Sequence, residues 1–318
     1  MPYSLNALYA VVNLSKQAVS QLFKRRGERD EKLVYLQLRV DAWREVHPGC
    51  GLAKMYGALQ PDFIGRDRFV ALFLEMGYQV FYPKNYIRTT FSVHCQYENL
   101  ISGAVLTGVN QLVQSDITYF VLGAQHFYGV FIIDVYSKRI VGHQVSDHMF
   151  TTANVQALNQ LVELRGEEAM RFLVHHSDHG VQYTSKMYTQ KLLDMGCLIS
   201  MADTAQQNAY AERINGTIKN EYVYLWDISG LEKLQNAVER AVRHYNFYRP
   251  HNHLPDKLPP VKFEKALASG KLKKDSHYEL VFDENNFHKR PHAKSLGGFD
   301  KVPANEHRNK LVCPISDV

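Results

Sequence analysis

Three acidic residues lie where strongly apolar segments end or are interrupted. Asp116 lies within QLVQSDITYF, Asp178 ends RFLVHHSD, and Glu212 lies in the first turns of a segment with helical periodicity. A carboxylate among apolar strand residues is unfavourable unless it meets a cation or leaves the core. If the two strands are neighbours and the helix packs across the sheet, the three carboxylates converge although they are far apart in the chain.

Such a set of oxygen ligands, with open coordination positions, suits Mg²⁺. Two ions about 3.5–4 Å apart can activate an attacking oxygen and stabilise a leaving one in phosphodiester cleavage or transfer. Mn²⁺ is expected to be able to replace Mg²⁺ at this site. Each acid taken alone is more often a strand end, a turn former or a solvated helix residue, so the prediction depends on their convergence.

The elements that must position these acids begin where the periodicity changes, at about residue 111. Alternating strand and helix patterns predict an α/β fold with a mixed sheet flanked by helices. The expected strands are 111–120, two strands within 128–145 around a turn at 136–138, 171–178 and 197–201. The expected helices are 152–165, 184–196, 208–225 and 231–248, with a polar loop at 202–207.

The first part of the chain has the pattern of short helices. An apolar run at residues 8–12 predicts a first short helix, and Ser15 is expected to cap a second helix that ends at Phe23. Helices at about 31–46, 51–60 and 65–78 follow, so two helix-turn-helix units are predicted, with a plain helical bundle as the alternative. Three cations that end the second helix, Lys24, Arg25 and Arg26, are candidates for phosphate contact.

The net charge of +5 at pH 7 divides unevenly along the 318 residues. Residues 1–110 carry 13 basic against 9 acidic residues, residues 111–229 carry 8 against 12, and residues 230–318 carry 16 against 11. An acidic middle between basic flanks suits a cation site between polyanion-binding arms. Ordinary variation between segments explains the same difference.

Composition excludes several classes of protein. A chain with 45% hydrophobic and 22% charged residues is globular rather than disordered. The four cysteines form no CxxC pair, which argues against a disulfide framework or a zinc module. The sequence has no apolar run long enough for a membrane span and no signal-peptide pattern, so we expect a reduced cytoplasmic protein.

An ordered series of motifs resembles a known family. The strings SDITYF, FIIDVYSKRIVGH, HHSDHGVQYTS, NAYAERINGTIKNE and YNFYRPHNHL resemble the catalytic core of insertion-sequence transposases of the insertion-sequence-three type. These are OrfB-like members of the DDE transposase and integrase superfamily. HPGCGLAKMYGALQ with GRDRFVALFLEMGY is similar to the family's second helix-turn-helix, which adds Arg66 and Arg68 as candidate DNA contacts.

The resemblance covers roughly residues 33–267 and implies a ribonuclease H-like core preceded by an all-α region. It implies that Asp116, Asp178 and Glu212 are the catalytic triad and hold two Mg²⁺ ions. The implied activity is strand cleavage and strand transfer on DNA, at element ends and target. The expected division is a helix-turn-helix region 1–78, a linker 79–110, a catalytic core 111–267 and a basic tail 268–318.

The chain departs from the family at two places. The stretch between Asp178 and Glu212 is two residues shorter than usual, which we interpret as a trimmed loop within ADTAQQ beside an intact triad. Val113 stands where relatives usually have Trp, which weakens a packing contact without touching a proposed ligand.

Secondary candidates surround the triad. Lys219 and Asn215 share a helix face with Glu212 that would look towards DNA. Asp134 either caps the turn after it or binds metal. His176 and His179 are expected to support the site or to face DNA, and we do not expect these two to form a transition-metal site with His175. Arg249 and His251 are expected to be structural.

Three functions are open from the sequence: a transposase, a ribonuclease H-like nuclease that cuts without joining, and a non-catalytic DNA-binding regulator. Intact acids at all three positions argue against the last. A transposase must hold two DNA ends, so we expect at least a dimer on DNA in the nucleoid, with a protein of an upstream frame as a further partner and no membrane contact.

Overall fold

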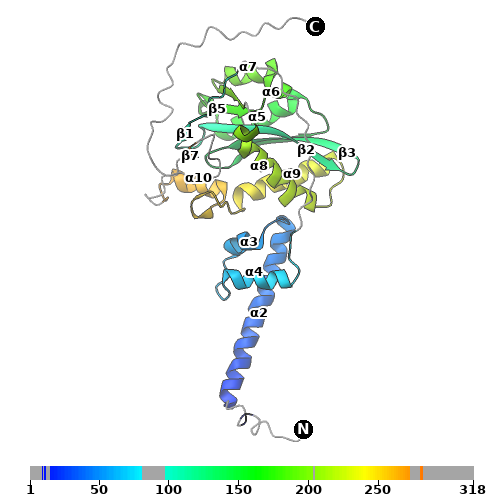
Figure 1. Cartoon of the computed structure of the whole chain (residues 1–318), viewed down its shortest axis with the longest axis vertical. Coiled ribbons are helices and arrows are strands. Elements are labelled where there is room, and N and C mark those ends of the chain that lie inside the picture. The colour runs from blue at the N-terminus through cyan, green and yellow to red at the C-terminus, as the bar shows by residue number, and fades with distance from the viewer. Residues whose placement is uncertain are drawn as a thin grey trace. The chain divides into compact units, whose positions relative to one another are not determined.

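The computed structural model describes residues 15–80, 97–202, 205–272 and 280–281, together with Tyr9 and Val11. The chain forms two compact units, Met1–Phe81 and Tyr82–Val318 (Figure 1). Predictions for several parts of the chain fall outside the described residues: most of the helix expected at 8–12, residues 81–96 of the linker, Cys95, Cys313 and nearly all of the tail.

The first unit contains one long helix where we predicted two. Helix α2 (Lys16–Val46) begins at Ser15, whose side chain accepts a hydrogen bond from the amide of Ala18 at 3.1 Å, as expected of an N-cap. The predicted end after Phe23 is wrong, because the helix continues through Gly27. One glycine inside a helix costs only about 1 kcal/mol, and the lysines, arginines and glutamates around it favour helix.

Two short helices pack on the C-terminal half of α2. Helix α3 (Leu52–Leu59) and helix α4 (Arg66–Glu75) are joined by a turn that starts at Gln60, in the left-handed conformation. Their common core contains Leu36 and Val40 of α2 with six residues of α3, α4 and the turn: Leu52, Met55, Leu59, Ile64, Phe69 and Phe73. The α3–turn–α4 pair lies where the sequence predicted the second helix-turn-helix.

The second unit is built on a mixed five-stranded sheet with the order β4-β3-β2-β5-β6. Strands β2, β3 and β4 form an antiparallel meander, and β5 and β6 add to β2 in parallel. The bounds are β2 Leu112–Leu122, β3 Gln125–Asp134, β4 Ile140–Ser146, β5 Val174–Ser177 and β6 Leu198–Met201. The predicted ribonuclease H-like α/β core is therefore confirmed.

Helices cover both faces of this sheet (Figure 1). One face packs against α5 (Thr151–Arg165), α6 (Val181–Thr184) and α7 (Lys186–Asp194). The other face packs against α8 (Ala209–Glu221) and α9 (Leu231–Phe247). Burial on both sides explains why β3 ends in an almost unbroken apolar run rather than an alternating one.

Two features of this unit differ from the prediction. The helix expected to reach residue 225 ends at Glu221, and a separate 3-10 turn follows at Val223–Leu225. Helix α10 (Pro260–Ala268) was not predicted. Its start is marked by Pro259 and Pro260, and proline in the first helical turn is a recognised signal.

The end of the expected linker is packed into the core. Ile101 and Leu106 are buried in one apolar cluster with Leu112 and Phe263. Strand β1 (Val105–Leu106) pairs antiparallel with β7 (Leu280–Val281). Residues 97–110 therefore contribute to the stability of the second unit.

Two general expectations concern cysteines and membranes. Among the described cysteines, Cys50 and Cys197 are buried thiols. None of the helices in the described part of the chain combines the length and apolarity that crossing a membrane requires.

Candidate active site

Asp116, Asp178 and Glu212 come from three elements that meet at the centre of the sheet, where β2 pairs with β5 and α8 packs on β2. Asp116 lies in the middle of β2, and Asp178 directly follows β5. Because β2 and β5 are parallel neighbours with Gln114 opposite His176, the two aspartates are brought side by side. Glu212 lies in the first turn of α8, which packs on β2 and β3.

The carboxyl group of Asp116 has the most perturbed environment of the three. Burial and the negative charges of Asp178 and Glu212 raise its pKa to about 8. The amide of Ile117 and the side chain of Asn215 oppose this shift by hydrogen bonding. A shift caused partly by both other acids means that all three carboxyl groups lie within electrostatic range.

The other two acids are more open. Asp178 is half-buried, and burial raises its pKa, while the amide of Gly180, 3.0 Å from Oδ1, and the charge of His179 lower it. Glu212 is exposed. Partial burial of its carboxyl group is the larger cause that raises its pKa, and the negative charge of Asp178 is the smaller one. The site is therefore a half-open patch of mutually repelling carboxylates.

This donor set fits a divalent cation chemically, since hard carboxylate oxygens with solvent access are what Mg²⁺ binds, and a cation would relieve the repulsion. Among the described residues, no group of three or more His, Cys, Asp or Glu side chains is arranged to hold one metal ion. Any two of the acids with water and a phosphate oxygen would suffice for Mg²⁺, which usually keeps several waters.

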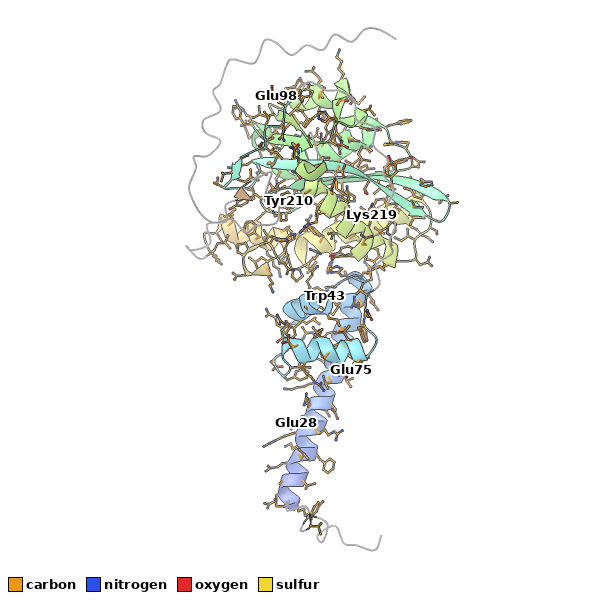
Figure 2. All side chains as sticks on the ribbon, in the orientation of Figure 1. Glu28, Trp43, Glu75, Glu98, Tyr210 and Lys219 are labelled. Carbon is orange, nitrogen blue, oxygen red and sulfur yellow. The ribbon has the colours of Figure 1, made fainter. Side chains whose placement is uncertain are left out.

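Two residues of α8, Asn215 and Lys219, interact with Asp116 (Lys219 is labelled in Figure 2). The side-chain amide of Asn215 donates to Oδ2 of Asp116 at 2.8 Å. Burial lowers the pKa of Lys219, and the charge of Asp116 raises it, so the ammonium group lies in the field of that carboxylate. Both residues lie on the helix face that they share with Glu212, as the sequence predicted. The sequence did not predict their interactions with Asp116.

Asp134 caps its turn. Its Oδ1 accepts hydrogen bonds from the amide and hydroxyl of Ser137 at 2.8 and 3.1 Å. Its Oδ2 accepts from the amide of Asn110 at 2.8 Å and lies 3.7 Å from Arg165. The carboxylate is buried and its oxygens are occupied by these donors, which favours the turn-capping alternative over metal binding.

The histidines beside Asp178 have different surroundings. His175 lies 2.9 Å from the hydroxyl of Tyr188, and His176 lies 2.8 Å from the hydroxyl of Ser200. Both rings are buried, and burial lowers their pKa values to about 4 and about 3. His179 is half-buried near Asp178. Only His179 has the exposure that a DNA-facing role requires.

The YRPH motif has a structural explanation in this fold. The guanidinium of Arg249 donates two hydrogen bonds to Glu221, at 2.8 and 2.7 Å, which ties the end of α9 to the end of α8. His251 is buried against the ring of Tyr245.

The remaining candidate DNA contacts belong to the first unit. Lys24, Arg25 and Arg26 are exposed in the middle of α2 rather than at a helix end. Arg66 and Arg68 are exposed in the first turn of α4, and Arg66 forms a surface ion pair with Asp67 at 2.9 Å. These five cations are accessible.

Sequence reasoning missed several residues that surround the acids. Gln114 and Asn208 connect β2 to the start of α8. Tyr183 is fully buried, and its hydroxyl lies 2.7 Å from that of Ser115, next to Asp116. Arg213 lies 3.1 Å from His253 on a neighbouring flank of α8. A polar residue two positions before a strand aspartate is a signal that could have identified Gln114.

The sheet order, with helices on both faces, is that of an integrase-type core, and comparison with known proteins agrees. Family models described as integrase core domain match residues 107–207 and 195–260. The transposase for insertion sequence element IS629 of Shigella sonnei is 32% identical over 247 residues, which cover 76% of this chain and 81% of that protein. The chain belongs to the insertion-sequence transposases of the insertion-sequence-three type.

Other similarities are more partial. A protein of insertion sequence element IS986/IS6110 of Mycobacterium tuberculosis is 32% identical over 165 residues, 49% of this chain and 58% of that protein. The chain thus spans little more than half the length of this relative. The HTLV-2 integrase catalytic core domain, solved in complex with magnesium, is 20% identical with a TM-score of 0.40, over 52% of this chain and 99% of that chain.

Proposed function

We propose that the chain is a DNA transposase that cleaves DNA at the ends of its insertion sequence and joins the freed 3′ ends to a target. The observation that carries the proposal is the convergence of Asp116, Asp178 and Glu212 from three separate elements, close enough for the charges of the other two to act on Asp116. Membership of a family that includes the IS629 transposase supports the same activity.

Asp116, Asp178 and Glu212 would hold Mg²⁺, or Mn²⁺ in its place, as a pair of ions. When bound, the ions would supply activation of the attacking oxygen and stabilisation of the leaving one. The HTLV-2 integrase core, which was solved with magnesium, is consistent with this choice of metal.

The residues of the chain have separate tasks in this reaction. Asn215 holds the carboxylate of Asp116 in place through its hydrogen bond. Lys219 places a cation beside the acids, where it would contact a DNA phosphate. Hydrolysis of a first phosphodiester leaves a 3′ hydroxyl. That hydroxyl then attacks a phosphodiester of a second strand, forms the new phosphodiester and displaces the 3′ oxygen of the attacked strand, so one site serves both steps.

The DNA itself would be held mainly by cations outside the site. Lys24, Arg25, Arg26, Arg66 and Arg68 are exposed and suit contacts to phosphate. Because two element ends must be held together, the working complex is at least a dimer on DNA in the nucleoid. A protein from an upstream frame is a further expected partner.

The test is a DNA cleavage and joining assay on the DNA that flanks the gene, in the presence of Mg²⁺. It compares the wild-type protein with Asp178→Asn. The matched control is Asp194→Asn, an exposed aspartate on α7. We expect cleaved and joined products from wild type and control, and none from Asp178→Asn, whose DNA binding persists. An active Asp178→Asn protein overturns the proposal.

Two other functions have distinct outcomes in the same assay. A nuclease without strand transfer would cut but would not join a pre-cut end with a free 3′ hydroxyl. A non-catalytic regulator would bind DNA but neither cut it nor bind a divalent metal at millimolar concentration.

A further inference from the structure

The first turn of α8 is capped by a side chain from β2 rather than by its own residues. Asn208, at the N-cap position, makes no side-chain hydrogen bond to its helix. Instead, Oε1 of Gln114 accepts from the amide of Tyr210 at 3.1 Å, and Nε2 donates to the carbonyl of Gln207 at 2.8 Å. Gln114 thus satisfies one of the amides that every helix start leaves unpaired.

A second side-chain hydrogen bond links the same two segments, and here the side chain belongs to the start of α8 and the backbone group to β2. Nδ2 of Asn208 donates to the carbonyl of Ser115 at 3.0 Å. Gln114 is 0% exposed and Asn208 3% exposed, so water does not compete for these bonds. A buried polar group that loses its partner pays the full desolvation penalty, which makes the arrangement specific.

The two ties act on the segments that directly precede the acids. Residues 114 and 115 come just before Asp116, and residues 207, 208 and 210 come just before Glu212. Alternate residues of a strand share one face, so Gln114 and Asp116 both project towards α8. Gln114 contacts the start of α8 (Tyr210 in Figure 2), and Asp116 contacts Asn215 further along it.

Glu212 lies between these two contact points. A helix held at two positions along a strand can neither slide nor rotate freely, so the contacts of Gln114 and Asp116 fix where Glu212 stands relative to β2. We propose that Gln114 is a positioning residue that sets Glu212 against Asp116 and Asp178. The inference rests on the proposed function, in which these acids bind the metal.

The decisive variant is Gln114→Met, which removes both hydrogen bonds at nearly constant volume. Its matched control is Asn246→Leu, because Asn246 of α9 makes an equivalent pair of buried bonds to the amide and carbonyl of Ile140, at 3.0 and 2.9 Å. Asn246 ties a different helix to β4, and none of the three acids lies on either element. Both variants should lose similar thermal stability.

We make four measurements on the full chain, and we expect the two variants to differ in two of them, kcat and Mn²⁺ affinity. Gln114→Met should lower kcat for cleavage about 10- to 100-fold, the effect of a small misplacement of a reacting group. It should also weaken Mn²⁺ binding, measured by calorimetry without DNA, by about tenfold, while KM and DNA affinity change less than about threefold. Asn246→Leu should leave all four near wild type.

The outcomes separate this inference from the proposed function. Equal kcat and Mn²⁺ affinity in the two variants would mean that Gln114 is structural only. A wild type that neither binds Mn²⁺ nor cleaves DNA would overturn the proposed function instead. If Gln114→Met does not fold, Gln114→Asn keeps a polar amide but is too short to reach both Tyr210 and Gln207, and wild-type kcat and Mn²⁺ affinity for it overturn the inference.

Discussion

The side-chain amide of Asn215 donates a hydrogen bond to Oδ2 of Asp116 across 2.8 Å, between residues 99 positions apart. The ammonium group of Lys219 lies in the field of the same carboxylate. A neutral donor and a cation therefore oppose the repulsion from Asp178 and Glu212. Burial, together with the charges of Asp178 and Glu212, nevertheless raises the pKa of Asp116 to about 8. A bound cation would favour the ionised form of Asp116.

Asp116→Asn should stabilise the metal-free protein while abolishing cleavage. The asparagine can still accept the hydrogen bond from Asn215, and it removes a carboxyl group crowded by two others. We expect a gain of about 1–2 kcal/mol, reduced from the full electrostatic effect because the site is partly solvated. Thermal unfolding at pH 7 measures it. Millimolar Mg²⁺ should stabilise wild type and not the variant, and equal metal-induced shifts would contradict the assignment of Asp116 as a ligand.

Glu264→Gln should destabilise the second unit strongly. Glu264 of α10 pairs with Arg139 at 2.6 Å and with Arg165 at 2.5 Å, all three side chains being less than one-fifth exposed. Burial tends to raise the pKa of Glu264, but the hydrogen bonds and positive charge of Arg165 lower it below its ordinary value. Removing the charge leaves two buried guanidinium groups with one fewer partner, which costs about 3–5 kcal/mol.

The control for Glu264 is Asp67→Asn, which breaks the pair with Arg66 between side chains that are 88% and 64% exposed. A pair of this kind contributes about 0–1 kcal/mol. Urea unfolding of both variants compares a buried with an exposed pair, and similar losses would mean that the Glu264 network carries little stability.

His175 should make the second unit less stable in mild acid. Burial lowers its pKa to about 4, whereas an unfolded histidine titrates near 6.5. Between these values the unfolded chain binds the proton and the folded one does not, so the free energy of unfolding falls as pH falls. His175 contributes at most about 1.4 kcal/mol per pH unit to this slope, and buried His176, whose pKa is lowered to about 3, adds a similar contribution that remains in a His175 variant. In urea titrations from pH 7 to 4.5, His175→Phe should flatten this dependence, while exposed His126→Gln should not.

Replacing Lys24, Arg25 and Arg26 by glutamine should weaken DNA binding and its dependence on salt. If all three contact phosphates, the slope of log K against log salt should decrease by up to about 2.7. Anisotropy titrations with end-sequence DNA at several salt concentrations measure it. Lys262→Gln with Lys265→Gln, two exposed lysines of α10, is the control. An unchanged slope in the triple variant would remove α2 from the DNA interface.

Local patterns predicted the core well because strands and helices depend on residues close in sequence. The alternation around Asp116 and the 3.6-residue period of 152–165 need no tertiary information, and Ser15 caps its helix through a residue three positions away. Where local signals compete, the prediction was weaker. The basic stretch around Gly27 carried both helix-forming and helix-ending signals, and the structure has a continuous helix there.

The roles of individual polar residues were decided at longer range. Asp134 had two interpretations from sequence, and contacts from Asn110 and Arg165 favour one of them. Arg249 had no mechanism until its pairing with Glu221 was known. Each partner lies more than 20 residues away, and no periodicity specifies such a contact.

The sequence alone determined which residues of this protein carry charge in apolar strands, and in which order its strands and helices follow, since both depend on residue type and short-range spacing. Only the tertiary structure decided how Asp116, Asp178 and Glu212 stand relative to one another, and that Gln114 caps the helix that carries Glu212. The physical reason is that a carboxylate's pKa and a helix's position on a sheet depend on distances between segments about 100 residues apart, which are fixed only when the sheet has assembled and water has left the interface.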